Sequence, residues 1–369
     1  MKYFVLAGEA SGDKQAALLC EALFRHDISA DITGWGGEAM SDLGVKVTRH
    51  YRELAYMGFA EVVKHLPDIL RNFKKCKAEI LQLAPDALIL VDYPGFNLRM
   101  AKWAHKHQIP VYYYISPQLW AWHTSRVHGI KKAVRKMYVI LPFEKEFYRQ
   151  YGMEVMYIGH PLAVDISKSG DFHYAPSRKR IGLLPGSRRH EVERILPEMA
   201  GLMRLMPDYS FTVAAVPHLP VSLYDHYLSG ISNVGMVIGD MKKVLRDSEA
   251  AIVTSGTATL ETALLGVPQI VVYKGSPLSY RIAKRLIKVR FISLVNLIMD
   301  RLLVPELIQA DCNPEKMKEE LTRILNPEVS ATIRKAYSQL SGLLTSGGGA
   351  EAAATDIISD IRNTNHGKI

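Results

Sequence analysis

Short apolar runs alternate with amphipathic stretches along the first part of the chain. Between them lie helical patterns, such as SGDKQAALLCEALF and a longer region over about residues 54–83. Strands that alternate with helices predict a parallel sheet covered by helices on both faces. The runs expected to form strands are KYFVLAG, DITGWGG, DALILVDYP, IPVYYYISP, KMYVILPF and VMYIGHP.

The alternation breaks over residues 161–180, which are polar, contain glycine and prolines, and show no clear period. It restarts with RIGLLPG and continues through YSFTVAAV, NVGMVIG, AAIVTSG and PQIVVYK. We therefore expect an α/β protein with a first Rossmann-like domain over residues 1–165, a linker over 166–180 and a second such domain over 181–345. Two domains of this kind bind ligands in the cleft between them, beyond the carboxyl ends of their strands.

Composition narrows the class of protein. The 369 residues are 48% hydrophobic and 22% charged, which is typical of a soluble globular protein of more than one domain. The formal charge of +9 favours an anionic partner: nucleic acid, a membrane surface or a phosphorylated substrate. The basic residues are spread out and form no nucleic-acid motif, so nucleic acid ranks last.

Cysteine usage and terminal hydropathy bear on location. The 3 cysteines are far apart and form no CxxC, so neither a disulfide framework nor a thiolate zinc site is indicated. The N-terminus does not have the pattern of a signal peptide, and no apolar run is long enough to cross a bilayer. We expect the protein in the cytoplasm.

The first strand is followed by GEASGD instead of a dinucleotide-binding GxGxxG. Glu9 would repel a pyrophosphate at this turn, whereas Ser11 and Asp13 can hydrogen-bond hydroxyl groups. The turn therefore suits a sugar better than a nucleotide. An equally good interpretation is that Asp13 only caps the following helix.

Two turns in the second domain suit anions. GLLPGSRRHEVE places Gly186, Ser187 and Arg188 before a helix, and TSGTATLE does the same with Gly256 and Thr257. Glu261 falls one turn inside the second of these helices, where a carboxylate can accept both hydroxyls of a ribose. Taken singly, these features also fit capped helices with solvated charges; together they favour a nucleotide-sugar donor.

Nine motifs occur along the chain in this order: AGEASGD, ELAYMGFAEVV, VDYPGFN, YYISPQLWAW, LPFEKEFY, YIGHPLAVD, LLPGSRRHEVE, TSGTATLE and SLVNLIMDRLLVPELIQ. By these motifs the chain resembles the lipid-A-disaccharide synthase family of GT-B glycosyltransferases almost from end to end. This resemblance implies the GT-B fold, with two Rossmann-like domains facing across a cleft, and a last helix over residues 346–369 that returns to the first domain.

The resemblance also implies a reaction. The family transfers 2,3-diacylglucosamine from UDP to the 6-hydroxyl of 2,3-diacylglucosamine 1-phosphate, with inversion, without a metal and without a cofactor. The product is the β-1,6-linked lipid A disaccharide. No Asp-x-Asp pair typical of metal-dependent transferases occurs in the chain. The expected partners are the two lipid substrates and the cytoplasmic leaflet of the inner membrane, with a homodimer left open.

Site residues carry over by position. The expected nucleotide contacts are Gly186, Ser187, Arg188, Gly256, Thr257, Glu261 and Asn296. The expected acceptor-side wall holds Ser11, Asp13, Trp120, Trp122 and Arg126, the last of these near the acceptor phosphate. The sequence departs from the family pattern at His123, Val295, Met299 and Asp300.

Asp92 is the candidate catalytic residue. It follows the apolar run ALILV, and Pro94 and Gly95 define the turn after it. A sugar hydroxyl needs a base to remove its proton as the new bond forms, so Asp92 is expected to act as that base or to orient the acceptor. Without the resemblance, an Asx-turn that only shapes the loop would be the better interpretation.

Residues 56–77 combine apolar and basic side chains in a pattern that suits a membrane surface. We expect a peripheral contact with the inner membrane; an ordinary helix packed on the sheet is the alternative. The residues expected to contact lipid are Met57, Phe59, Leu66, Phe73, Lys74 and Lys75. Two rival functions remain: a UDP-N-acetylglucosamine 2-epimerase-like isomerase, and a non-catalytic lipid-binding protein of the membrane surface.

Overall fold

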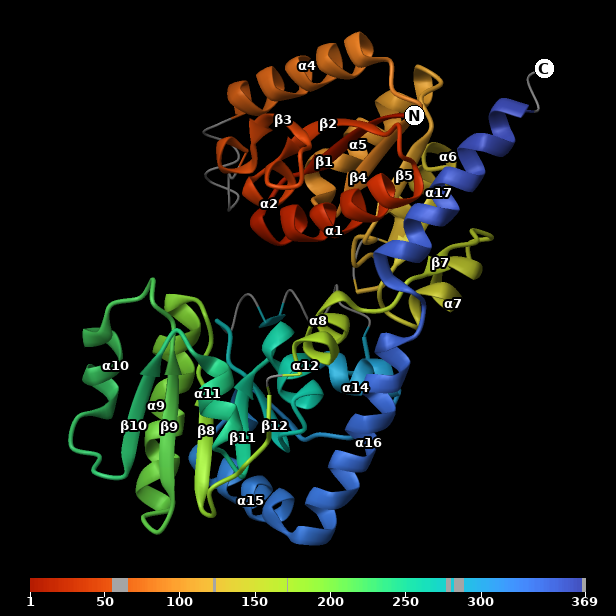
Figure 1. Ribbon diagram of the computed structural model, residues 1–369. Coiled ribbons are helices and arrows are strands. Elements are labelled where there is room, and N and C mark those ends of the chain that lie inside the picture. Colours follow the sequence, from red (N-terminus) through yellow and green to blue (C-terminus); the bar gives the residue numbers. More distant parts are fainter. Residues whose placement is uncertain (55–65, 122–123, 171, 277–279, 282–288, 367–369) are drawn as a thin grey trace. The chain divides into compact units, whose positions relative to one another are not determined.

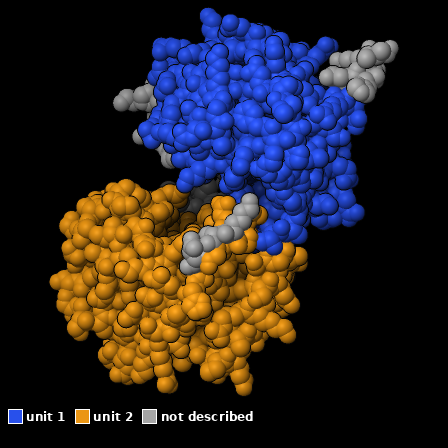
Figure 2. Space-filling view, viewed as in Figure 1, with its two compact units in different colours: residues 1–161, 344–369 blue, residues 162–343 orange. Residues whose placement is uncertain are grey.

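The chain folds into two compact units (Figure 2). Unit 1 comprises Met1–Pro161 and Leu344–Ile369, and unit 2 comprises Leu162–Leu343. The computed structural model describes residues 1–54, 66–121, 124–170, 172–276, 280–281 and 289–366. Each unit is built around its own parallel sheet with helices on both faces (Figure 1).

The sheet of unit 1 has the strand order β3-β2-β1-β4-β5-β6-β7, and all its pairs are parallel. The central strand β4 (Ala87–Val91, ALILV) is buried along its whole length, as expected for a strand covered on both faces. The other strands are β1 (Lys2–Ala7), β2 (Asp31–Gly36), β3 (Lys46–His50), β5 (Val111–Tyr114), β6 (Lys136–Val139) and β7 (Met156–Tyr157).

Successive side chains of β1 point to opposite faces of this sheet and enter two separate cores. Tyr3 and Val5 pack with one group of helices, and Phe4 and Leu6 pack with the other. The first core is covered by α1 (Ala10–His26) and α17 (Gly349–His366), which pack against each other. The second is covered by α4 (Leu66–Leu83), α5 (Pro94–Lys106) and α6 (Val127–Ala133). Short helices complete the unit: α2 (Glu38–Ser41), α7 (Glu144–Arg149), and the 3₁₀ turns η1 (Tyr51–Glu53) and η2 (Thr124–Arg126).

The sheet of unit 2 has the order β10-β9-β8-β11-β12-β13 and is also parallel throughout. Its strands are β8 (Arg180–Leu184), β9 (Ser210–Ala215), β10 (Val234–Ile238), β11 (Ala250–Thr254), β12 (Gln269–Tyr273) and β13 (Glu306–Ile308). Its helices are α8 (Pro161–Ser169), α9 (Arg189–Leu205), α10 (Val221–Leu228), α11 (Met241–Arg246), α12 (Thr257–Leu264), α14 (Leu294–Met299), α15 (Pro314–Leu325) and α16 (Pro327–Thr345), with the 3₁₀ turn η3 (Gln309–Asp311).

Two segments differ from the sequence-based expectation, and a third is described only in part. The polar stretch after residue 160 begins with helix α8, and Ile166 of that helix packs on the core of unit 2. The edge strand β3 was not expected, because KVTRH has few apolar residues and is only partly buried. The long helical region over residues 54–83 is described only from Leu66 onward, as α4.

Candidate functional site

The turn after β4 holds the candidate catalytic aspartate in an unusual backbone conformation. Asp92 and Tyr93 both have positive φ, at 44° and 47°, which is strained for residues with side chains. The Asp92 amide donates to the carbonyl of Tyr114 at 3.0 Å. The Asp92 carbonyl accepts from Asn97 Nδ2 at 2.8 Å and from the Tyr113 hydroxyl at 2.7 Å. Neighbouring elements therefore fix this backbone before any ligand arrives.

The Asp92 carboxyl lies in a largely buried environment at the carboxyl end of β4. Burial, which disfavours the charged form, is the main cause that raises the pKa of Asp92 to about 6, and the negative charge of Glu9 adds to it. A hydrogen bond from the Tyr93 amide acts in the opposite direction. A carboxyl with this pKa can accept a proton near neutral pH and release it again.

The opening GEASGD turn packs directly on the Asp92 turn. A side chain at Gly8 would meet the ring of Tyr93 at 2.2 Å, so only glycine fits there. The Ser11 hydroxyl is exposed and donates to Glu9 Oε1 at 2.6 Å. This turn therefore supplies the negative charge of Glu9, which helps to raise the pKa of Asp92. It also leaves the Ser11 hydroxyl exposed to solvent.

Asp13 differs from both sequence-based interpretations. Its carboxylate is buried, 3% exposed, and accepts from the backbone amides of Gly37, Ala39 and Met40. It therefore caps α2, which follows β2, and not its own helix α1. With its oxygens held by these amides, Asp13 positions a loop of unit 1.

The remaining acceptor-side candidates follow β5 in the sequence. Trp120 is half-buried and packs edge-on against Phe143, with ring centroids 5.0 Å apart. Arg126 is exposed at the start of α6 and lines a groove between α5 and α6. Trp122 lies outside the described residues.

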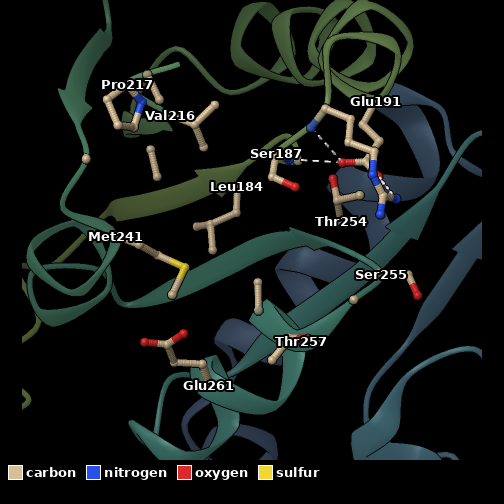
Figure 3. Close-up of a pocket in the computed structure, with 17 residues that line it drawn as sticks. Leu184, Ser187, Glu191, Val216, Pro217, Met241, Thr254, Ser255, Thr257 and Glu261 are labelled. Carbon is tan, nitrogen blue, oxygen red and sulfur yellow. Dashed lines mark hydrogen bonds and ion pairs between the residues drawn. The ribbon is translucent and has the colours of Figure 1, made fainter. Parts of the chain in front are cut away.

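A pocket of about 480 Å³ opens at the carboxyl ends of β8, β9 and β11 in unit 2. Figure 3 shows Ser187 and Glu191 on one side of it and Glu261 on the other. The pocket brings together all but one of the residues expected to bind the nucleotide, namely Gly186, Ser187, Arg188, Gly256, Thr257 and Glu261. This volume is within the range of small-molecule sites.

The two helix N-termini at this pocket are not equivalent. At α9, the carboxylate of Glu191 accepts from the amides of Ser187 at 2.9 Å and Arg188 at 3.1 Å, and it also pairs with the Arg188 side chain. At α12, the N-cap is Gly256, which has no side chain to offer, and no partner is recorded for the amide of Thr257 among the described residues. The α12 N-terminus therefore has no side-chain cap, whereas the Glu191 carboxylate occupies the turn before α9.

Glu261 and Thr254 add polar groups to the pocket. Burial raises the pKa of Glu261, which lies in the second turn of α12. The Thr254 hydroxyl is buried at the end of β11 and has no hydrogen-bond partner among the described residues. Sequence reasoning missed the far wall, formed by Val216, Pro217, Gly239 and Met241, because these residues follow β9 and β10 without a recognisable motif.

Asn296 does not line this pocket. It is fully buried in α14, and its Nδ2 donates to the Val304 carbonyl and to Glu306 Oε1, at 2.9 and 2.8 Å. Its Oδ1 accepts from the amides of Leu303 and Val304. Because these contacts use the whole hydrogen-bonding capacity of the amide, Asn296 holds the loop before β13 and has no side-chain hydrogen bond left to offer a nucleotide.

The proposed membrane segment is described in part. Met57 and Phe59 lie outside the described residues, and the side chain of Leu66 is likewise not described. Phe73 corrects the expectation: it is 9% exposed and stacks on Phe96 with ring centroids 4.0 Å apart, so it belongs to the core. Lys74 and Lys75 are exposed on the outer face of α4.

Among the described residues, no helix has the length and hydropathy needed to cross a membrane. Within the same residues, no group of three or more His, Cys, Asp or Glu side chains is placed to hold a metal ion.

Solved structures with similar folds include the UDP-GlcNAc 2-epimerase from Neisseria meningitidis bound to UDP-GlcNAc, with a TM-score of 0.64 at 14% identity over 99% of this chain and 100% of that one. The calicheamicin glycosyltransferase CalG4 has a TM-score of 0.61 at 15% identity over 98% of both chains. At these identities the likeness concerns the fold alone.

Sequence relatives are much closer. Lipid-A-disaccharide synthase of Trichlorobacter lovleyi is 38% identical over 98% of both chains, and that of Geobacter sulfurreducens is 37% identical over 96% of this chain and 95% of its own. A family model described as lipid-A-disaccharide synthetase matches residues 3–352. These matches confirm the family and the GT-B fold expected from the nine motifs. The chain belongs to the lipid-A-disaccharide synthetase family of glycosyltransferases.

Proposed function

We propose that this glycosyltransferase moves 2,3-diacylglucosamine from UDP to the 6-hydroxyl of 2,3-diacylglucosamine 1-phosphate. The products are the β-1,6-linked disaccharide 1-phosphate and UDP. Family membership supports the reaction class. The observation that carries the site assignment is the Asp92 carboxyl, held on a fixed turn with a pKa of about 6.

UDP is proposed to occupy the pocket of unit 2. The α12 N-terminus presents amides and the positive end of the helix dipole, which suit the diphosphate. Glu261 faces the same pocket and can accept the ribose hydroxyls. The unpartnered hydroxyl of Thr254 offers a further hydrogen bond. Arg188 can join the diphosphate if its exposed side chain turns from Glu191, because the guanidinium is 72% exposed in this pair.

The chemical step needs one base. As the acceptor oxygen forms its bond to the anomeric carbon, its proton passes to the Asp92 carboxylate, and the bond from that carbon to the β-phosphate oxygen breaks. Attack from the face opposite UDP inverts the anomeric configuration. The negative charge that develops on UDP is stabilised by the α12 amides, which act as fixed donors, and by Arg188 once it has turned from Glu191.

Both substrates are lipids, so we propose that the protein works at the cytoplasmic surface of the inner membrane. The exposed face of α4 supports this proposal. Leu70 is 58% exposed there, beside the basic residues Arg71, Lys74 and Lys75. Each basic residue near an anionic leaflet contributes about 1 kcal/mol of attraction.

The test is to incubate the purified protein with UDP-2,3-diacylglucosamine, with and without 2,3-diacylglucosamine 1-phosphate, and to measure UDP and disaccharide. We expect UDP release only when both lipids are present, in equal amount to the disaccharide. An epimerase would instead convert an unacylated UDP-N-acetylglucosamine without any acceptor. Conversion of that sugar, with no disaccharide from the two lipids, would contradict the proposal.

A further inference from the structure

Besides the pocket of unit 2, the protein has a cavity of about 380 Å³ in unit 1, in the groove between α5 and α6. It begins at Pro94 and Gly95, two and three residues after Asp92, and extends along α5 to Lys102. At 1.5 Å per residue, Leu98 and Lys102 lie about 6 and 12 Å along the helix from Pro94. The groove therefore starts beside the proposed catalytic turn and leads away from it. Its floor is apolar, formed by Leu98, Ala101, Ile130 and Ala133.

Its rim is cationic and uncompensated. Arg99, Lys102 and Arg126 line the groove and are exposed, and none of them has an ion-pair or hydrogen-bond partner among the described residues. No aspartate or glutamate lines the cavity, and none occurs in the sequence between Asp92 and Glu144. Three cations around one cavity repel one another, so a bound anion would stabilise this arrangement.

The combination of rim and floor defines the class of ligand. Arginine binds phosphate oxygens with a planar fork of donors, and lysine adds a point charge. A small soluble anion would leave the apolar floor exposed to water, whereas a phosphorylated lipid can cover it with part of an acyl chain. A phosphate bound here also belongs near the reacting hydroxyl, because the groove and Asp92 share the turn that begins α5.

We propose that the α5–α6 groove binds the phosphate monoester of the acceptor lipid, with Arg99 and Lys102 joining Arg126 as its ligands. This inference rests on the proposed function and assigns one end of the acceptor to named side chains. It makes the groove the element that distinguishes a phosphorylated acceptor from an unphosphorylated one.

The test compares two acceptors, 2,3-diacylglucosamine 1-phosphate and 2,3-diacylglucosamine, with wild-type protein and the double variant Arg99→Gln/Lys102→Gln. We expect the wild type to prefer the phosphorylated acceptor in kcat/KM, and the double variant to lose at least about tenfold of that preference, since hydrogen bonds to charged groups are lost. The KM for the UDP-linked donor should stay unchanged. Lys106→Gln is the control: it removes one positive charge from the last turn of α5, outside the groove, and should preserve the preference.

Two further measurements separate the sources of phosphate. Glucosamine 1-phosphate should bind the wild type more tightly than glucosamine does by calorimetry, and the double variant should abolish that difference. Flotation with phosphatidylglycerol vesicles free of acceptor should be unchanged in the double variant. Lost flotation with an intact acceptor preference would assign the groove to membrane headgroups and overturn the proposal.

Failure of the groove inference and failure of the proposed function would give different results. If wild-type protein forms no disaccharide at all, the proposed function fails, and glucosamine 1-phosphate binding still decides whether the groove takes a phosphate monoester. If transfer proceeds and the double variant keeps the full preference for the phosphorylated acceptor, the inference about the groove is wrong while the proposed function stands.

Discussion

Replacing Asp92 with asparagine should stabilise unit 1 at neutral pH while it removes the proposed base. The carboxyl is largely buried, and its pKa is raised from the ordinary 3.8 to about 6. One pKa unit is worth about 1.4 kcal/mol, so the charged side chain costs unit 1 about 3 kcal/mol once it is fully ionised. Asparagine has nearly the same shape and carries no charge, so it avoids this cost.

The pH dependence follows from the direction of the change. At pH 4 the carboxyl is almost fully protonated in the folded chain and about two-fifths protonated in the unfolded chain, so the two proteins should differ by less than about 1 kcal/mol. As pH rises through the folded pKa, the natural protein loses stability relative to the variant. The difference should reach about 3 kcal/mol at pH 8 in favour of Asp92→Asn.

Urea denaturation followed by tryptophan fluorescence measures this difference, because all 4 tryptophans, Trp35, Trp103, Trp120 and Trp122, belong to unit 1. Asp42→Asn, at an exposed aspartate of the same unit, is the control for the chemical change from aspartate to asparagine. A difference between Asp92→Asn and the natural protein that does not change between these two pH values would refute the reasoning.

Four further substitutions test contacts and exposed positions that the structure shows. Glu9→Gln should lower the pKa of Asp92, because a neighbouring negative charge is removed. The acid limb of the pH–rate profile for disaccharide formation should then move to lower pH. A limb that does not move would argue against the electrostatic coupling of Glu9 and Asp92. Asn296→Ala should cost unit 2 about 2–4 kcal/mol in calorimetric unfolding, because four buried hydrogen bonds are lost; weaker UDP binding at unchanged stability would instead make it a ligand contact. Phe73→Ala should destabilise unit 1 by about 3–5 kcal/mol, because Phe73 is buried against Phe96. Leu70→Ser should leave the stability of unit 1 within about 0.5 kcal/mol and weaken flotation with anionic vesicles, because Leu70 is exposed. The reverse pattern would contradict the division of α4 into a buried and an exposed face.

The two sheets could be predicted because their strands are strongly patterned. A run such as ALILV has only one stable environment, between two layers of helices, and its length identifies it as a strand. Strand β3 could not be recognised, because KVTRH lies at the sheet edge and few of its side chains need burial. Helix α8 escaped notice for a similar reason, since a short helix beside polar residues leaves a weak period.

The site likewise has features that the sequence predicts and features that it does not. Gly186, Ser187, Gly256 and Thr257 could be assigned to one pocket, because each follows a strand of the same parallel sheet and strand ends meet at one edge. Which helix N-terminus stays free could not be predicted, because it depends on where the Glu191 side chain turns.

Asp13 and Asn296 show a second limit. Their motifs mark them as important, yet both accept hydrogen bonds from backbone amides of other segments, at positions 37–40 for Asp13 and 303–304 for Asn296. A motif records that a residue type is needed at a position. It does not say whether the side chain faces a ligand or supports the loop that does.

The central claim is that Asp92 takes the proton of the acceptor hydroxyl. The measurement that tests it most directly is kcat/KM for disaccharide formation across pH 4.5 to 9, with the natural protein and with Asp92→Asn. We expect the natural rate to fall below a pH of about 6, and we expect the variant to lose at least about a hundredfold in kcat and to lack that limb. Near-normal turnover by Asp92→Asn, with the same pH dependence as the natural protein, would contradict the account.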